Sequence, residues 1–389
     1  MTNAQQPSIQ HLLQTLCPDG VEQQALENIL DYEQPSKYIV HDTNYDDSYT
    51  IPVLTAGQSF ILGYTNEEKA IYHASKENPV IIFDDFTTSF HWVDFNFKVK
   101  SSAIKILKPK TSDNFRYIYY AMQTIKFIPA EHTRHWISKY SHFPIPLPPL
   151  PIQERIVEIL DKFSRLSAEL EAELEAELEL RKKQYDFYRN RLLSFDSNSD
   201  TVQWMPLGEV CRYAKERIAS DLVNAQNYVS VENLLPNKLG VTVALSVPQS
   251  GNCIKYQPND ILIGNIRPYL QKIWIADRMG GTNGDVLTLH IIDEYQEQII
   301  PRYLYQVLSS NTFFDYDNQH AKGAKMPRGD KNAVLRFPIP LPPLPVQERI
   351  VGILDKFETL VSDLSQGLPA EINLVQKQYE YYRNQLLTF

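Results

Sequence analysis

The 389-residue sequence lacks several features that would assign it to other classes of protein. No apolar run approaches the roughly 18 residues that a membrane helix needs. The first residues, Met1-Thr-Asn-Ala-Gln-Gln, have neither the basic start nor the apolar core of a signal peptide. The three cysteines, Cys17, Cys211 and Cys253, show no paired spacing and so suggest neither a disulfide framework nor a zinc site. We expect a reduced, cytoplasmic protein that contacts no membrane.

Positive charge is also scarce. The net charge is −9, and none of the segments into which we divide the chain below is basic as a whole. A nucleic-acid binder usually carries a basic footprint. If this chain binds DNA, we expect partner subunits to neutralise much of the phosphate charge.

Catalytic signatures are missing as well. The sequence contains no GxxxxGK[ST] phosphate loop, no GxGxxG fingerprint, no HExxH and no Asn/Asp-Pro-Pro-aromatic motif. The paired acids of Phe83-Asp-Asp-Phe86 are better read as a turn at a strand end than as a nuclease centre, and the histidines beside Arg134 as a polar loop. We therefore expect no catalytic residues, no metal site and no cofactor bound by this chain alone.

What the sequence does have is a long internal repeat. The segment 143–163 returns as 337–357, with 19 of 21 residues identical at a constant offset of 194. A weaker match at an offset of 181 relates Val21, Leu26, Ile29 and Tyr32 to Val202, Leu207, Val210 and Tyr213. A period of this length is that of a domain with its connector, so two similar halves are expected.

Each half shows short strands and a small helix, then a stiff Pro-rich connector and a long helix. We expect strands near 49–55, 79–83, 97–107, 228–231, 260–264, 272–276 and 285–292, and helices at 115–122 and 301–308. The long helices, 152–193 and its repeat, carry matching apolar stripes that favour antiparallel pairing. The expected fold class is α+β: two similar mixed domains joined by two long coiled-coil helices, with a pseudo-twofold repeat.

Two details of the helices bear on length. Residues 168–179 read Ala-Glu-Leu-Glu three times, either a plain helix former or a spacer whose length changes by whole units. Its six glutamates argue against phosphate contact there. The sequence Gly367-Leu-Pro369 predicts a kink or break in the second helix.

Two variable regions, each followed by Leu-Pro-Pro-Leu-Pro-x-Gln-Glu-Arg-Ile at 147–156 and 341–350, resemble the specificity subunit of type I restriction–modification enzymes. The opening Leu16-Cys-Pro-Asp-Gly-Val21 is similar too, and the resemblance covers the whole chain. It implies target-recognition domains at 1–142 and 196–336. The connector and central helix would occupy 143–195, and the connector and C-terminal helix 337–389.

The resemblance also implies a division of labour. Each domain would read one half of a split, asymmetric site in double-stranded DNA, and the paired helices would set the unread spacer. Two methylation subunits, using S-adenosylmethionine to modify adenine, would dock on the helices, and restriction subunits would add ATP- and Mg-dependent translocation and cleavage. The positions expected to meet these partners are Gln153, Glu154, Arg155, Gln347, Glu348 and Arg349.

Donors that could reach base edges or phosphates cluster in a few polar segments. In the second domain the expected DNA contacts are Lys322, Lys325, Arg328, Lys331, Asn265, Arg267 and Tyr269. In the first they are Thr55, Gly57, Gln58, Thr87, Thr88, His91, Arg134 and Lys139. An ordinary solvated loop is the alternative for each. For the whole chain, the alternative is a two-lobed adaptor that gathers partner helices without binding DNA, which the acidic charge favours mildly.

Overall fold

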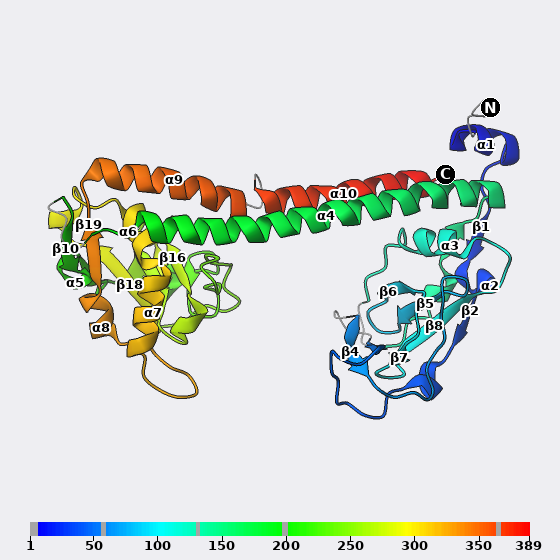
Figure 1. Ribbon diagram of the computed structural model, residues 1–389, viewed down its shortest axis with the longest axis horizontal. Helices are drawn as coiled ribbons and strands as arrows, with labels where there is room; N and C mark the ends of the chain where they lie inside the picture. Colours follow the sequence, from blue (N-terminus) through cyan, green and yellow to red (C-terminus); the bar gives the residue numbers. More distant parts are fainter. Residues whose placement is uncertain (1–6, 56–59, 130–132, 197–200, 363–366) are drawn as a thin grey trace. The chain divides into compact units, whose positions relative to one another are not determined.

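The computed structural model describes residues 7–55, 60–129, 133–196, 201–362 and 367–389 (Figure 1). Contacts divide the chain into two units. Unit 1 comprises residues 1–170 and 375–389, and unit 2 comprises residues 171–374. Each unit therefore combines one strand-rich globule with part of the central helix and part of the C-terminal helical segment.

The globule of unit 1 places an antiparallel sheet of order β2-β8-β5-β6 beside a smaller sheet of order β4-β3-β7. Its elements are α1 (Ile9–Leu16), β1 (Gln23–Ala25), α2 (Leu26–Ile29), β2 (Leu30–Glu33), η1 (Pro35–Tyr38), β3 (Ile51–Leu54), β4 (Ile61–Thr65), β5 (Val80–Asp84), β6 (Phe90–Val93), β7 (Lys98–Val99), β8 (Ile104–Pro109), α3 (Phe115–Met122), η2 (Tyr140–His142) and β9 (Pro144–Pro146). The single strand expected at 97–107 is wrong, because a turn at 102–103 separates β7 from β8.

The globule of unit 2 repeats the larger sheet in the order β11-β18-β15-β16, beside a second sheet of order β12-β14-β17-β13. Its elements are β10 (Gln203–Pro206), α5 (Leu207–Val210), β11 (Cys211–Tyr213), β12 (Arg217–Ala219), η3 (Ser220–Leu222), β13 (Tyr228–Val229), β14 (Asn252–Tyr256), β15 (Ile261–Gly264), η4 (Pro268–Leu270), β16 (Ile273–Ile275), β17 (Gly280–Thr282), β18 (Val286–Ile291), η5 (Asp293–Tyr295), α6 (Pro301–Leu308), α7 (Asn311–His320), α8 (Lys331–Arg336) and β19 (Pro338–Leu341).

The Pro-rich connectors pair with the start of their own globule. Strand β9 runs antiparallel to β1, and β19 runs antiparallel to β10. The second residue of each following helix is proline, Pro151 in α4 (Leu150–Leu192) and Pro345 in α9 (Leu344–Ser362). Proline suits the first helical turn, where no amide donor is needed. Each connector thus fixes the point at which its helix leaves the globule.

The long helices pack antiparallel, as expected. In unit 1 the start of α4 shares a core with the end of α10 (Leu368–Leu387), and the ring of Phe163 lies 5.7 Å from that of Tyr379. In unit 2 the ring of Phe357, on α9, lies 5.4 Å from that of Tyr188, near the end of α4. The predicted interruption is present at Gly367, which lies outside a helix directly before α10 begins at Leu368.

The small helix of each globule anchors the long helix that follows it, through the same contacts. Arg116 on α3 donates from Nε to Asp161 at 2.9 Å. Arg302 on α6 donates in the same way to Asp355 at 2.8 Å. These matched contacts, together with the repeated sheet order, confirm the α+β class and the two similar halves.

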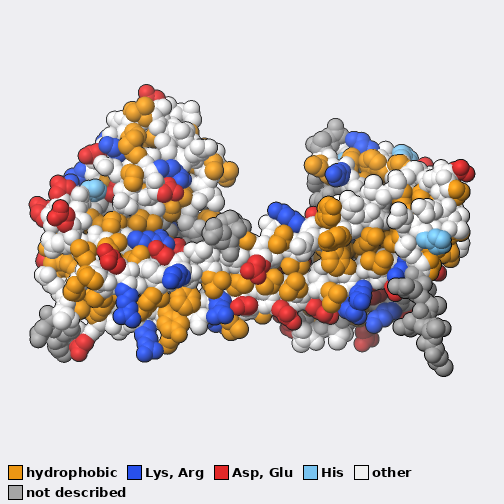
Figure 2. All heavy atoms as spheres, turned by 90° about the horizontal axis from the view of Figure 1, so that it is seen from above, with side chains coloured by type: hydrophobic (Ala, Val, Ile, Leu, Met, Phe, Trp, Pro, Cys, Tyr) orange, Lys and Arg blue, Asp and Glu red, His pale blue; other side chains and the backbone are white. Residues whose placement is uncertain are grey.

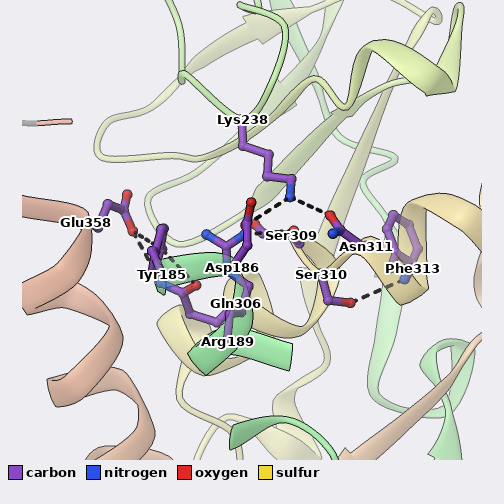
Figure 3. Close-up of polar contacts among 10 residues, drawn as sticks. All are labelled: Tyr185, Asp186, Arg189, Lys238, Gln306, Ser309, Ser310, Asn311, Phe313 and Glu358. Carbon is purple, nitrogen blue, oxygen red and sulfur yellow. Dashed lines mark hydrogen bonds and ion pairs between the residues drawn. The ribbon is translucent and has the colours of Figure 1, made fainter. Parts of the chain in front are cut away.

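In unit 2 the far end of α4 is bound to the globule by a buried polar cluster (Figure 3). Arg189 is only 4% exposed, donates to the carbonyl of Ser309 at 3.2 Å and lies over the Tyr185 ring. Lys238 donates to Asn311 Oδ1 at 3.0 Å, and its ammonium lies 3.8 Å from Asp186. Burial and the nearby Arg189 guanidinium lower the pKa of Lys238 to about 8.

Candidate nucleic-acid interface

The structure of unit 2 brings together two segments that the sequence predicts to contact DNA. The turn that follows β15 forms a backbone bridge to the segment 322–331, between Ile266 and Arg328. Arg267 donates its backbone N–H to the Pro327 carbonyl at 2.7 Å. Six of the seven residues predicted for this domain, all except Asn265, carry exposed side chains on these joined segments: Lys322, Lys325, Arg328, Lys331, Arg267 and Tyr269.

The cations here are exposed and weakly held. The Lys322 side chain is 80% exposed and its ammonium lies 2.7 Å from Asp330. The hydrogen bond from Lys322, together with those from the backbone N–H groups of Ala333 and Asn332, lowers the pKa of Asp330 to about 2. Arg328 is 60% exposed and lies 3.1 Å from Asp285. Exposed ion pairs contribute little stability, so either cation could exchange its carboxylate for a phosphate at small cost.

Asn265 departs from its expected role. Its side chain is only 6% exposed, so it lies too deep to contact a base, and its backbone carbonyl instead accepts the Gly329 N–H at 3.1 Å.

Arg267, two residues after Asn265, has a left-handed backbone conformation, with φ of 54°. Non-glycine residues seldom adopt this conformation, and when they do they concentrate at functional sites. Together with Lys272, Glu232 and other residues, Arg267 lines a cavity of about 430 Å³.

The sequence gives no indication of the buried acid behind this surface. Asp317, on α7, is 1% exposed and neither of its carboxylate oxygens has a hydrogen-bond partner among the described residues. Burial raises the pKa of Asp317 to about 6. An added Cβ at Gly329 would lie 2.6 Å from Asp317 Oδ1 and 2.8 Å from Asn265 Oδ1. No sequence signal marks Asp317, because it is one of two acids in a polar helix, the other being Asp315.

The predicted contacts of unit 1 are partly assembled. His91, on β6, stacks on Phe60 with ring centroids 4.1 Å apart, and burial lowers the pKa of His91. Phe60 accepts the backbone N–H of Thr55 at 3.0 Å, which links that predicted residue to the same corner. Gly57 and Gln58 lie outside the described residues.

The remaining four lie on two neighbouring segments of unit 1. Thr87 is exposed in the turn after β5 and donates to Asp84 Oδ2 at 2.7 Å, whereas Thr88 beside it is buried with φ of 60°. The paired acids of this turn therefore cap backbone and hydroxyl groups, as the sequence favours. Arg134 is exposed and reaches Ser102 Oγ at 3.5 Å, and Lys139 is exposed at the start of η2.

Two of the six positions expected to meet partner subunits are not on the surface. Gln153 and Gln347 are fully buried and bond within their own units. We correct their role to an internal one. The charged residues beside them differ: Glu154, Glu348 and Arg349 are exposed, and Arg155 is half-buried next to Glu158.

An apolar groove lies on the paired helices within unit 1. It has a volume of about 570 Å³ and is lined by Arg155, Glu158, Ile159, Lys162, Phe163, Leu166, Tyr382, Gln385 and Leu386. Tyr382 is 53% exposed and Leu166 is 48% exposed. Figure 2 shows hydrophobic side chains lying between charged ones at the surface of the helices. Mixed apolar and charged helix faces of this kind suit the docking of another protein.

The comparisons with known proteins agree with this arrangement. The family model for the type I restriction modification DNA specificity domain matches twice, over residues 18–180 and 199–374. The specificity subunit of the type I restriction enzyme EcoR124I/EcoR124II of Escherichia coli is 40% identical over an alignment 397 positions long, which covers 95% of this chain and 95% of that protein.

A solved structure described as the basis of complex assembly and conformational transition of the type I restriction–modification system shares the fold. Its TM-score is 0.56 at 14% identity, over 92% of this chain and 97% of that one. Among the described residues, none of the helices has the length and apolarity that a membrane crossing requires. The repeated globules, the paired helices and these matches together show that this chain belongs to the family of type I restriction–modification specificity subunits and carries two DNA target-recognition domains.

Proposed function

We propose that each globule reads one half of a split, asymmetric site in double-stranded DNA, and that the paired helices set the unread spacer. The observation that carries this proposal is that the two globules share the same sheet but present different exposed side chains on it. The two larger sheets have the same strand order, yet the exposed side chains after β5 and β15 are Thr87 in one and Arg267 in the other. A common scaffold with different surface donors is what two different half-sites require.

Two methylation subunits would dock on two equivalent surfaces of the helices. Two aromatic residues that line the unit 1 groove, Phe163 and Tyr382, have counterparts 194 positions away in unit 2, Phe357 and Tyr188. The ring centroids are 5.6 Å apart in unit 1 and 5.4 Å apart in unit 2. The exposed charges of Glu154, Glu348 and Arg349 would border these surfaces. A duplicated surface supports a stoichiometry of two partners.

The partners would supply the chemistry. S-adenosylmethionine would be bound by the methylation subunits, and ATP with Mg by the restriction subunits. Their basic surfaces would also offset the net charge of −9 on this chain. A complex that acts on genomic DNA would work in the cytoplasm.

A methylome tests this function. Modified adenines would be mapped in cells carrying this gene with its methylation subunit, and in cells with the methylation subunit alone. We expect a split motif that appears only when this chain is present. Absence of any motif, with the methylation subunit active and bound, would favour the adaptor alternative instead.

A further inference from the structure

The two units hold Arg134 and Arg328 in the same backbone frame. In unit 1, Asp85 lies in the turn after β5. Its backbone N–H donates to the Ala103 carbonyl at 2.9 Å, and its carbonyl accepts from His135 N at 2.8 Å. In unit 2 the same two bonds recur. Asn265 N donates to the Asp285 carbonyl at 2.9 Å, and Gly329 N donates to the Asn265 carbonyl at 3.1 Å.

An arginine precedes the amide donor of this frame in both units. Arg134 comes directly before His135, Arg328 comes directly before Gly329, and the two arginines are 194 positions apart. Both are exposed. Each guanidinium reaches back to the segment that leads into β8 or β18, at Ser102 and Asp285 respectively. The arginines are thus equivalent in position, in exposure and in the segment that they lie against.

The residues around them are not equivalent. Three positions after each arginine stand Ile137 and Lys331, and the turns of the frame carry Thr87 and Arg267. A side chain shared by two domains that read different half-sites cannot distinguish those half-sites. Contacts common to different sequences are the ones made to the DNA backbone, whereas base edges are read by groups that differ.

We propose that Arg134 and Arg328 each bind a backbone phosphate of their own half-site and so fix the register in which the neighbouring, unlike side chains read bases. This inference rests on the proposed DNA-reading function. A guanidinium suits the task because its planar fork can give two hydrogen bonds to the oxygens of one phosphate. The proposal separates positioning residues, alike in both domains, from specificity residues such as Arg267.

Substitution of Asp285 distinguishes phosphate binding by Arg328 from base reading by Arg328. Its carboxylate lies 3.1 Å from the Arg328 guanidinium. If Arg328 binds phosphate, this carboxylate repels the same phosphate, and Asp285→Asn tightens DNA binding. If Arg328 instead reads a base, Asp285 orients it, and Asp285→Asn weakens binding and broadens the recognised half-site. The second result would overturn the proposal.

The experiment uses the assembled methyltransferase and a duplex carrying the split site that the methylome defines. Dissociation constants would be measured over a range of salt concentrations for the wild type, Arg134→Ala, Arg328→Ala and Arg328→Lys. Each alanine variant should lose roughly tenfold in affinity at low salt and reduce the slope of log affinity against log salt by about one. Because lysine keeps the charge but loses the planar fork, Arg328→Lys should keep the salt slope of the wild type and lose less affinity than Arg328→Ala. The methylated motif should stay unchanged in all of them.

Matched controls are Lys76→Ala and Lys215→Ala, which remove one exposed cation from the globule of unit 1 and unit 2 respectively. Thermal unfolding would verify that every variant is folded. Affinity and salt slope equal to those of the controls, or a motif that relaxes in one half-site, would overturn the proposal. A wild-type complex without site-specific binding would instead refute the DNA-reading function on which it rests.

Discussion

Gln153 and Gln347, 194 positions apart in the chain, each make three hydrogen bonds in their separate units, two of them to equivalent partners and the third to the Asp113 carboxylate or to the Gln298 carbonyl. Gln153 accepts from Asn114 N at 2.8 Å and donates to Asp113 and to the Pro148 carbonyl. Gln347 accepts from Ile300 N at 2.9 Å and donates to the carbonyls of Gln298 and Pro342. Each amide therefore joins the Pro-rich connector, the start of the long helix and the entry to the small helix of the globule.

Replacing either glutamine should loosen the joint that it makes. Gln153→Leu leaves the partly buried Asn114 N–H and the buried Pro148 carbonyl unpaired, which we expect to cost unit 1 about 3 kcal/mol of unfolding free energy. Gln347→Leu should cost unit 2 a similar amount. Hydrogen exchange at Asn114 N and Ile300 N would report each unit separately. The exposed neighbour Glu154→Gln is the control, and equal exchange rates in Gln153→Leu and this control would contradict the assigned role.

Lys238 should make the stability of unit 2 depend on pH. Its folded pKa of about 8 lies below the ordinary value of 10.5, so above pH 8 the unfolded chain binds more protons and stability rises with pH up to about 10.5. Denaturant titrations at pH 7.5 and 9.5 should show the rise, and Lys238→Met should abolish it. The comparison stops at pH 9.5 because ionisation of tyrosines would also change the stability at higher pH. An identical rise in Lys238→Met would show that another group titrates.

Gly329→Ala should damage the second recognition surface specifically. The added Cβ would lie 2.6 Å from a buried Asp317 oxygen and 2.8 Å from Asn265 Oδ1, so the segment carrying Arg328 must shift. We expect weaker binding to the second half-site, by roughly tenfold, with the first half-site unaffected. Competition between duplexes altered in one half-site would measure this. Gly284→Ala, where an added Cβ meets open space, is the matched control.

Changing the number of Ala-Glu-Leu-Glu units should change the DNA spacer. One added unit lengthens the helix by about 6 Å, which corresponds to one or two base pairs of added spacer. Removing a unit should shorten the spacer by the same amount, and this opposite variant is the control. Methylome mapping of both variants gives the spacers directly, and unchanged spacers would remove the measuring role from residues 168–179.

Loss of the exposed aromatic side chain in the groove should reduce binding of one methylation subunit. Tyr382 is 53% exposed, so Tyr382→Ala removes apolar docking surface while disturbing the fold little. Tyr188→Ala changes the matching position in unit 2, where the tyrosine is half-buried. Native mass spectrometry should show complexes with one methylation subunit in each single variant and none in the double variant. Full occupancy in the double variant would place the docking surface elsewhere.

The sequence alone determined the architecture, because periodic and repeated signals depend on local physics. The helices at Phe115–Met122 and Pro301–Leu308 were predicted with their bounds, and the repeat at an offset of 194 fixed the equivalence of the halves. The prolines of the connectors and of Gly367-Leu-Pro369 marked helix boundaries, since proline restricts its own backbone and that of its neighbour.

Only the tertiary structure decided which polar residues face outward. Gln153 sits in the most strongly repeated motif, yet it is buried, and Asn265 lies beneath the surface that the sequence placed it on. Asp285 and Asp317 carry no pattern of their own, because their environment is made by strands and helices distant in the chain. Burial and pairing are set by such long-range contacts, which one sequence without its fold does not specify.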